Sequence, residues 1–206
     1  MELIKKYYRN VIVLLLGVLL LSIGGALFLT ANIGSDSLMV FNQGISVVLK
    51  TKVGLAIMIS NIIALFIIFF INKKTLGLGS LAIIFLLGPT IQIIKDANIF
   101  KTPNTLILQI LMVLIGIVIG GLGLALYMYA DLGLSPFEGI IVTISNKTKV
   151  RFGIIKIIFD AIYFTTGALL GGVFGIGSIM TVFLYGPTID MFMKLLKKTN
   201  IIKKRP

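Results

Sequence analysis

Side chains that could do chemistry are few in this chain of 206 residues, and its carboxylates stand out. Histidine and cysteine are both absent, which removes the commonest general base, metal ligand and thiolate nucleophile. Of the seven acidic residues, four lie in the second half of the chain: Asp131, Glu138, Asp160 and Asp190. Because no nucleophile–base pair is recognisable, we expect neither an enzyme nor a bound metal or cofactor.

Three of these carboxylates have amide counterparts, because the sequence repeats itself. Residues of the first half recur in order at a spacing of about 99 residues, which slips to about 98 past the middle. The most specific match is 88–91, Gly-Pro-Thr-Ile, which returns identically as 186–189. The amide-to-carboxylate matches are Asn32 with Asp131, Asn61 with Asp160, and Gln92 with Asp190. The repeat therefore keeps polarity at three positions while it changes their charge.

These polar positions lie in apolar surroundings, where polar side chains are costly and usually face a cavity or a partner. We interpret them as a central site between the repeats that binds a small solute. Its predicted residues are Asn32, Asn61, Gln92, Asp131, Glu138, Asp160, Asp190, Thr90 and Thr188. Interhelical hydrogen bonds and helix caps are the alternative, and for Asp36 and Asp131 a capping role explains the residue at least as well.

Lys156 is the one basic residue inside a predicted spanning helix. It precedes Asp160 by four residues, so the two side chains share a helix face and could form an ion pair. Alternatively, Lys156 extends to the lipid headgroups from its position about one turn into the helix. From the sequence we favour this second interpretation.

Glycine and proline mark the places where the backbone around the site is expected to bend. The predicted hinges are Gly34, Gly133, Ser135, Pro136, Pro89 and Pro187. Proline has no N–H, so Pro89 and Pro187 free the carbonyls of Phe85 and Phe183 four residues earlier. Those carbonyls could bind a solute or an ion, whereas the alternative is a pair of kinks that serve packing only.

The elements that position these residues are predicted membrane helices. The chain is 58% hydrophobic and 13% charged, with a mean hydropathy of +1.10. Six apolar runs of about 18–26 residues are long enough to cross roughly 30 Å of hydrocarbon. They cover 11–31, 53–72, 76–94, 105–130, 153–172 and 176–193. The first run is too long for a typical signal peptide, so we expect a single transmembrane domain over residues 1–206.

Two further apolar segments, 37–49 and 135–146, are too short to span, because helices of this length reach only roughly 20 Å. The second segment begins with residues typical of a helix start. Ser135 can cap, Pro136 suits the first helical position, and Glu138 completes a capping box. We interpret both segments as half-helices that are re-entrant or lie at the interface.

These lengths predict an all-α polytopic membrane protein built from two tandem repeats, about 11–100 and about 104–196. With three spanning helices and one short half-helix in each repeat, the repeats are inverted. The alternative is eight spanning helices in parallel repeats, which the distribution of lysines mildly favours. We give segment length more weight, because unsatisfied backbone groups in lipid cost several kcal/mol each.

The net charge of +12 indicates membrane orientation rather than nucleic-acid binding. Most Lys and Arg residues lie at segment ends, in the pattern of positive residues on the inside. We therefore expect a multi-pass protein of the bacterial cytoplasmic membrane with both termini cytoplasmic. Its basic tail, 197–206, is expected to meet anionic lipid headgroups.

Several motifs resemble the YczE/YyaS/YitT family of bacterial membrane proteins, which shows a Gly-Leu-Gly-Ser-Pro-aromatic type of turn, then Gly-Ile-Gly-Thr/Ser, then Gly and Asp near the end of a repeat. The matching stretches here are 123–137, 174–178 and 186–190. The equivalent turn of the first half, 34–37, lacks the proline. The resemblance covers nearly the whole chain, implies a bacterial inner-membrane protein, and brings no catalytic residues.

The sequence favours a small secondary transporter that moves a polar, zwitterionic or cationic solute by alternating access. The alternative is a binding or assembly subunit that does not transport, such as the substrate-binding component of a larger importer or a helper of a membrane-associated enzyme. Expected partners are the lipid bilayer and a small-molecule solute, and an unidentified membrane or soluble partner is an alternative. Small residues four apart, such as Gly116 and Gly120, predict close helix contacts, either within the chain or across a homodimer.

Overall fold

The structure, a computed structural model, describes residues 2–199 and the side chains of residues 8–198. Over this range the chain forms helices and no strands. The helices are α1 (Glu2–Ala31), α2 (Ser37–Val48), α3 (Val53–Asn72), η1 (Lys73–Thr75), α4 (Leu78–Ala82), η2 (Ile83–Leu87), α5 (Gly88–Asp96), α6 (Leu106–Tyr129), α7 (Pro136–Thr148), α8 (Phe152–Leu169) and α9 (Ile176–Thr199). The all-helical class predicted from the sequence is confirmed for this part of the chain.

Six segments of the described chain are long and apolar enough to cross a membrane. They are Tyr8–Ala31, Val53–Thr75, Leu78–Asp96, Leu106–Tyr129, Phe152–Leu169 and Ile176–Lys198. The helices α2 and α7 have only 12 and 13 residues, too few to span the hydrocarbon. The chain is therefore a multi-pass membrane protein with two additional short helices.

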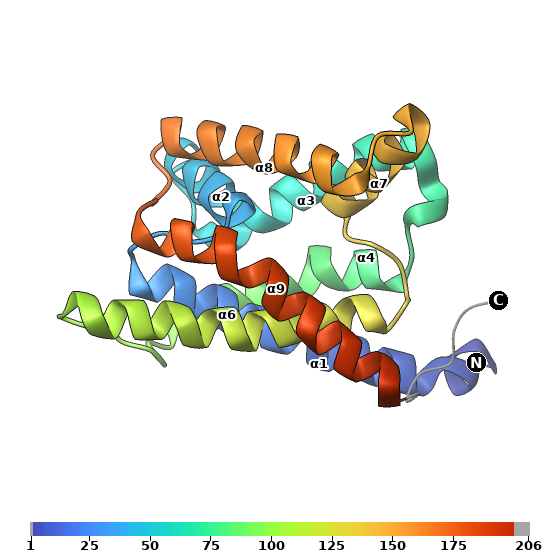
Figure 1. Ribbon diagram of the computed structural model, residues 1–206, viewed down its shortest axis with the longest axis horizontal. Helices are drawn as coiled ribbons and strands as arrows, with labels where there is room; N and C mark the ends of the chain where they lie inside the picture. Colours follow the sequence, from blue (N-terminus) through green and yellow to red (C-terminus); the bar gives the residue numbers. More distant parts are fainter. Residues whose placement is uncertain (1, 200–206) are drawn as a thin grey trace.

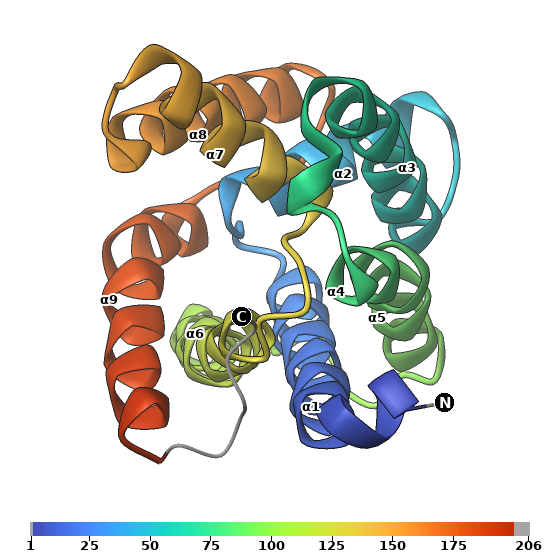
Figure 2. The ribbon, with the colours of Figure 1, turned by 90° about the vertical axis from the view of Figure 1, so that its right-hand side faces the viewer.

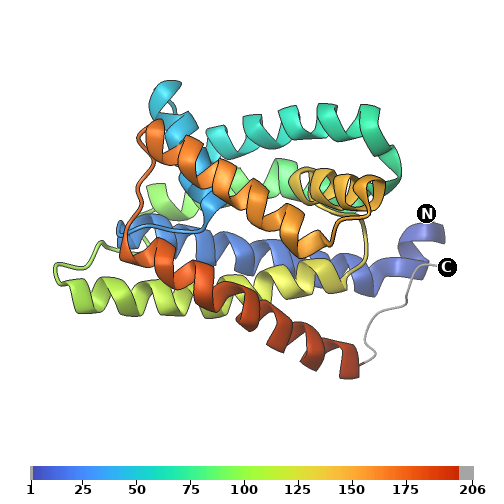
Figure 3. The same ribbon diagram turned by 45° about the horizontal axis from the view of Figure 1, so that its top comes forward.

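The spanning segments alternate in direction along the chain (Figures 1 and 3). Helices α1, α5 and α8 run one way, and α3, α6 and α9 run the other way. As a result, α1 begins and α9 ends at the same end of the molecule, which we call the N-terminal end. Figure 1 places α7 toward this end and α2 toward the opposite end, so the two short helices lie at different ends of the molecule.

Helices α1 and α6 lie side by side, between α9 and α5, as Figure 2 shows in a view along the bundle. They pack closely because small residues face each other. A Cβ atom on Gly24 would lie 2.6 Å from the Gly120 Cα atom, so any larger side chain would force the helices apart. Beside this crossing, Val18 and Tyr127 belong to one buried apolar cluster. The spacing of Gly116 and Gly120 therefore serves a contact within the chain.

The third spanning segment contains the irregular backbone that the sequence predicts around Pro89. Here η2 is one π-helical turn between α4 and α5, and a π turn accommodates a break in the regular hydrogen-bond ladder. In the second half, Pro187 lies inside the continuous helix α9.

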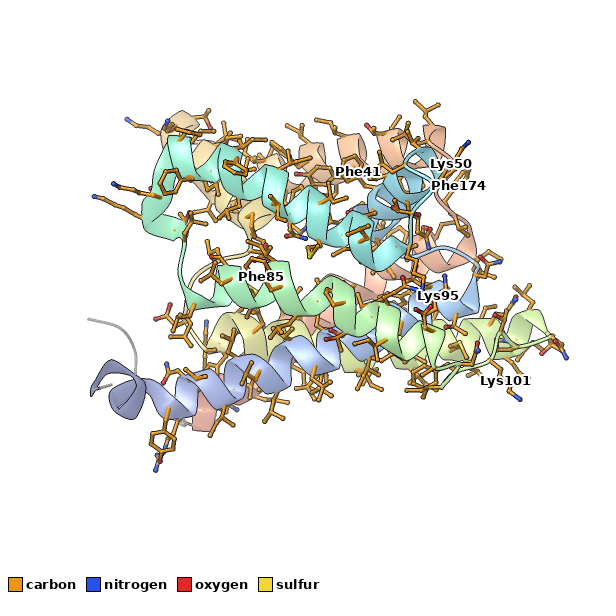
Figure 4. All side chains as sticks on the ribbon, turned by 180° about the vertical axis from the view of Figure 1, so that it is seen from behind. Phe41, Lys50, Phe85, Lys95, Lys101 and Phe174 are labelled. Carbon is orange, nitrogen blue, oxygen red and sulfur yellow. The ribbon has the colours of Figure 1, made fainter. Side chains whose placement is uncertain are left out.

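Charged residues gather at the two ends of the bundle. At the end opposite the N-terminal end, Lys50, Lys95 and Lys101 extend from neighbouring loops and helix ends (Figure 4). At the N-terminal end, the chain carries Lys73 and Lys74, the residues around the α7–α8 connection, and the last turns of α9. Residues 200–206 of the expected basic tail lie outside the described residues.

Candidate functional site

The two short helices begin in the same way, at equivalent positions of the repeat. Asp36 caps α2 by accepting a 3.2 Å hydrogen bond from the Met39 N–H. Ser135 caps α7 by accepting a 3.2 Å hydrogen bond from the Glu138 N–H. These contacts confirm the predicted cap at Ser135 and the capping alternative for Asp36. Each cap fixes a helix start whose backbone N–H groups favour negative charge.

The turns before the short helices also match in backbone conformation. Asn32 and Asp131 have φ values of 55° and 52°, and Gly34 and Gly133 have φ values of 103° and 112°. A φ near +110° is strained for any residue with a Cβ atom. The two glycines therefore fix the tight turns that were predicted as hinges at these positions.

Each turn packs against the beginning of a helix from the other half of the chain. The Gly177 N–H of α9 donates a 2.8 Å hydrogen bond to the Ile33 carbonyl, and the Gly79 N–H of α4 donates a 2.8 Å hydrogen bond to the Leu132 carbonyl. These two contacts are reciprocal in the repeat. They join the start of each short helix to the opposite half.

The two contacts differ in how their serine hydroxyls are satisfied. At the N-terminal end, Ser80 Oγ donates a 2.6 Å hydrogen bond to the Leu134 carbonyl and accepts a 3.0 Å bond from the Gly77 N–H. At the opposite end, the hydroxyls of Ser35 and Ser178 are buried and have no partner. Buried hydroxyls without partners are costly, so this second contact is the weaker of the two.

A cluster of charged and polar side chains lies where α2 meets α8. Asp160 Oδ1 accepts a 2.9 Å hydrogen bond from Ser37 Oγ, and Asp160 Oδ2 forms a 3.0 Å ion pair with Lys156 Nζ. The Lys156 and Asp160 side chains are 51% and 35% exposed. The ion pair corrects our preference for a headgroup contact at Lys156, because Asp160 lies one turn away on the same face.

Two further carboxylates surround this ion pair. Asp36 interacts electrostatically with Lys156 and Asp160, and Glu138 interacts electrostatically with Lys156. Tyr185 of α9 in turn lies near both Asp36 and Glu138. We call Asp36, Glu138, Lys156, Asp160 and Tyr185, together with Ser37, the central polar cluster.

Asp36 and Glu138 both lie outside the six spanning segments. Burial raises the pKa of both carboxyls, while the hydrogen bonds at each helix start and the charge of Lys156 oppose that rise. Glu138 Oε2 is buried and has no hydrogen-bond partner. Both carboxyls therefore hold a proton more readily than an exposed carboxyl does.

Of the nine predicted site residues, Glu138 and Asp160 lie in the central polar cluster. Asn61, the counterpart of Asp160, is buried in α3 and donates a 2.8 Å hydrogen bond to the Ile57 carbonyl. Thr90 is half-buried in α5, and Thr188 donates a 2.7 Å hydrogen bond to the Leu184 carbonyl of its own helix. These contacts within one helix correspond to the structural alternative considered for the polar residues.

The other four predicted residues lie near the ends of the bundle. Asn32 borders a surface hollow with Lys95 and Lys101, and Asp131 is exposed in the turn after α6. Gln92 donates a 2.8 Å hydrogen bond to Asp96 Oδ1 near the end of α5. Asp190 lines a shallow groove along α9 with Pro187, Lys194 and Lys198 among other residues. The nine residues therefore do not gather in one place.

Sequence reasoning missed three members of the cluster. Asp36 was interpreted mainly as a cap, and Ser37 and Tyr185 were given no role. Matches between amides and carboxylates at equivalent positions do not indicate Asp36 or Glu138, because Asp36 aligns with Ser135 and Glu138 aligns with Met39. A signal was present, because an acidic residue at the start of a short half-helix places its charge close to the opposite half.

The two halves differ at one equivalent helix seam. In the first half, α3 packs on α5 so closely that a Cβ atom on Gly54 or Gly88 would overlap the other's carbonyl oxygen. Gln92 Oε1 accepts a 3.1 Å hydrogen bond from the Gly54 N–H, and Lys52 and Asp96 form a 2.6 Å ion pair at the end of the seam.

In the second half, the corresponding helices α8 and α9 stand apart (Figure 2). Helix α8 packs on α2 and α7, and α9 packs on α6, but α8 and α9 make no extended contact with each other. Among the described residues, a Cβ atom on Gly153 or Gly186 would meet nothing within 4 Å. The half-exposed pair of Lys156 and Asp160 lies on the side of α8 that this separation uncovers.

Among the described residues, no group of three or more Asp, Glu, His or Cys side chains is arranged to hold a metal ion. The arrangement of the central polar cluster instead suits electrostatic binding and hydrogen bonding. Three carboxyls, one ammonium group and two hydroxyls surround the starts of α2 and α7.

Comparison with known proteins places the chain in a family. The model of the family described as "Family of unknown function (DUF6198)" matches residues 8–194. An uncharacterized protein of Haemophilus influenzae is 27% identical over 191 residues, which cover 93% of this chain and 86% of that protein. The uncharacterized protein YyaS of Bacillus subtilis is 26% identical over 200 residues, which cover 92% of this chain and 95% of that protein.

No solved structure matches the chain. The likeness to YyaS agrees with the family resemblance noted from the sequence. The family match extends from the first spanning helix into the last and includes both short helices and the whole central polar cluster. This chain belongs to the family DUF6198.

Proposed function

We propose that the protein is a small secondary transporter that moves a small polar solute across the bacterial cytoplasmic membrane by alternating access. In this mechanism two inverted repeats rock about a central site, so that the site opens first to one side and then to the other. The central polar cluster is the solute site.

Matched backbone features support the inverted repeats. The positive φ values come in equivalent pairs, Asn32 with Asp131, Gly34 with Gly133 and Lys50 with Lys149. The hydrogen bonds from Gly79 and Gly177 to the opposite turns are equivalent as well. The opposite directions of α1 and α6 (Figure 1) also support an inverted relation between the two repeats.

The single observation that carries the proposal is the difference between the two equivalent seams. Two repeats of similar sequence have one tight seam, α3 with α5, and one open seam, α8 with α9. An alternating-access transporter has this asymmetry in either end state, because one repeat is closed while the other is open.

The open seam faces the cytoplasm in this proposal. The N-terminal end carries Lys73, Lys74, Lys147, Lys149 and Arg151, whereas the opposite end carries Lys50, Lys52, Lys95 and Lys101 next to Asp96. The larger basic excess predicts that the N-terminal end is cytoplasmic, with both termini inside. Gly153 lies at this end of α8, so the structure corresponds to an inward-open state.

The charges of the central polar cluster favour a cationic or zwitterionic solute. Asp36, Glu138 and Asp160 provide three carboxyls, and Lys156 neutralises one of them. A positive group on the solute is attracted by the remaining carboxyls. The N-termini of α2 and α7 attract negative charge, so a zwitterion can use both features.

The first test is a thermal-stability screen of the detergent-purified protein against a metabolite library, at several pH values and Na⁺ concentrations. We expect one class of amines or amino acids to raise Tm. The effect should disappear in Asp160→Asn and persist in the control Asp131→Asn, whose residue is exposed in the turn after α6.

The second test measures uptake of a stabilising solute into proteoliposomes. Counterflow of labelled solute supports a transporter. If no solute stabilises the protein and no solute of this class is exchanged, transport by this chain is ruled out.

One observation favours a second candidate function, that of a binding or assembly subunit without transport activity. Only 6% of the apolar window of α9 is buried within the chain, so α9 has a large surface available for another membrane helix. Co-purification of a specific ATPase or enzyme from the native membrane, at constant stoichiometry, would support this alternative.

A further inference from the structure

We propose that the open seam closes by bringing α9 onto α8, and that Lys156 then exchanges its partner Asp160 for Glu138. This inference rests on the alternating access of the proposed function and adds a specific charge switch to it. The switch links the position of α9 to the state of the central polar cluster.

The closed seam of the first half is the template for this second state. There Gly54 packs on Gly88, and Gln92 binds the Gly54 N–H. The equivalent residues of the second half are Gly153, Gly186 and Asp190. Both glycines are retained although nothing touches them now, which indicates that a close approach of α8 and α9 is built into the sequence.

The residues that seal the template are apolar. Leu29, Met39, Ile57 and Ile91 form one buried cluster, with Leu87 packed against it. Their repeat counterparts are Met128, Glu138, Lys156, Ile189 and Tyr185, in the same order. The counterparts of Met39 and Ile57 are therefore a carboxylate and an ammonium group, and closure in the manner of the template buries the two together.

The present arrangement of charges and partners favours this exchange. Lys156 already lies near Glu138, and Glu138 Oε2 is buried without a partner. The present ion pair with Asp160 is half-exposed, so it is weak and readily exchanged. A charge enclosed by the closed seam requires a paired opposite charge, which Glu138 supplies.

Release of Asp160 has a consequence for the solute. Once Lys156 turns to Glu138, Asp160 retains the hydroxyl of Ser37 as its hydrogen-bond donor. A positive group on the solute then takes the place of Lys156 on Asp160. Binding of the solute cation and closure of the seam therefore favour each other.

The charges at the end of each seam explain why the α8–α9 seam of the second half is open. In the first half, Lys52 and Asp96 attract each other across the seam. Their counterparts Arg151 and Lys194 are both basic, so they repel each other as α9 approaches α8. The closed form of the second half is thus the less populated one, and it requires the new pair of Lys156 and Glu138.

Cysteine crosslinking tests this closure directly, because the natural chain has no cysteine. The pair Arg151→Cys with Lys194→Cys reports the α8–α9 seam, and the matched pair Lys52→Cys with Asp96→Cys reports the closed α3–α5 seam. Each variant is treated in membrane vesicles with a short bifunctional methanethiosulfonate reagent. We expect fast crosslinking of the control pair. The test pair should crosslink more slowly but completely, because its seam must still close from the open state after Arg151 and Lys194 are replaced, and an irreversible reagent traps a minor state.

Two further substitutions, made in the test pair, separate closure from the charge switch. Gly186→Leu fills the empty side of α9 and should abolish the crosslink, and Glu138→Gln should slow it about tenfold or more, because Lys156 loses its charged partner. The double change Glu138→Met with Lys156→Ile copies the sealed cluster of the first half and should speed the crosslink. The control pair in each background verifies the fold.

Three results would overturn the proposal. If the test pair does not crosslink after exhaustive reaction while the control pair does, the seam does not close. If it crosslinks equally fast with Gly186→Leu, the two cysteines meet without the predicted packing. If Glu138→Gln has no effect, closure occurs without the exchange of partners. Crosslinking needs no solute, so a failure to find transport activity would count against the proposed function and leave this inference to its own test.

Discussion

The two seams lead to a sharp prediction about a matched pair of glycines. Gly88 and Gly186 occupy equivalent positions of the repeat, and each precedes a proline within a spanning segment. Backbone preferences at the two sites are therefore similar, and the effect of an added methyl group depends on the neighbouring helix. We expect Gly88→Ala to destabilise the protein and Gly186→Ala to leave its stability nearly unchanged.

The magnitude follows from the contacts at each site. At Gly88 the new methyl group overlaps the Gly54 carbonyl oxygen, so α3 and α5 must separate by about 1 Å or more. Overpacking of this kind costs about 1–3 kcal/mol, and loss of the bond between the Gly54 N–H and Gln92 costs about 1 kcal/mol more. At Gly186 the methyl group meets no atom within 4 Å. The two variants should differ by about 2–4 kcal/mol, or roughly 4–16 °C in Tm for a chain of this size.

Limited tryptic digestion first verifies that both variants are folded. The assay is then thermal unfolding of both variants in the same detergent. Equal losses of stability in the two variants would refute the reasoning, because they would mean that α8 and α9 are packed like α3 and α5. A larger loss for Gly186→Ala would exclude the open seam altogether.

Two further predictions concern other differences within the repeat. Ser80→Ala removes both hydrogen bonds of the hydroxyl, one of them to Leu134, and should lower the free energy of unfolding by about 1–3 kcal/mol in thermal unfolding. Ser178→Ala removes a hydroxyl without a partner and should be neutral or stabilising. Equal effects of the two variants would contradict the assigned contacts. Asp160→Asn should change the free energy of unfolding by less than about 1 kcal/mol, because its ion pair with Lys156 is half-exposed. The same variant should weaken solute binding about tenfold or more in titration calorimetry. A large loss of stability with unchanged affinity would show that the pair is structural.

Hydropathy and segment length were sufficient to predict the helices. Crossing the hydrocarbon requires about 20 apolar residues, and the six predicted runs coincide with the six long apolar segments of the structure. The start of α7 was also predictable, since Ser135 and Pro136 act locally and need no tertiary context. Local chemistry and length set these features, so they can be deduced from one sequence.

The site could be predicted only in part. Matching amides with carboxylates identifies positions that are equivalent in the sequence repeat, but the structure places equivalent positions near helix ends at opposite ends of the molecule. Asn32 and Asp131 are such a pair. Only two of the predicted residues lie in the central polar cluster: Asp160, which binds Ser37 at the start of α2, and Glu138, which belongs to the start of α7.

The separation of α8 from α9 could not be predicted from the sequence. Gly153 and Gly186 match Gly54 and Gly88 in type and spacing, so the sequence describes both seams alike. In the proposed mechanism, which seam is closed depends on small differences in energy between two arrangements of the same elements. Such differences arise from pairs that meet only in three dimensions, like Lys52 and Asp96.

In the proposed alternating-access mechanism, that exposed ion pair makes the balance between the two orientations sensitive to the salt on one face of the membrane. Lys52 and Asp96 are 67% and 49% exposed, and such a pair weakens as ionic strength rises. An increase in salt on their face alone then shifts the balance toward the orientation in which the α3–α5 seam is open. Cells in brine and cells in fresh water would thus contain the two orientations of this protein in different proportions, without any change in its amount or its sequence.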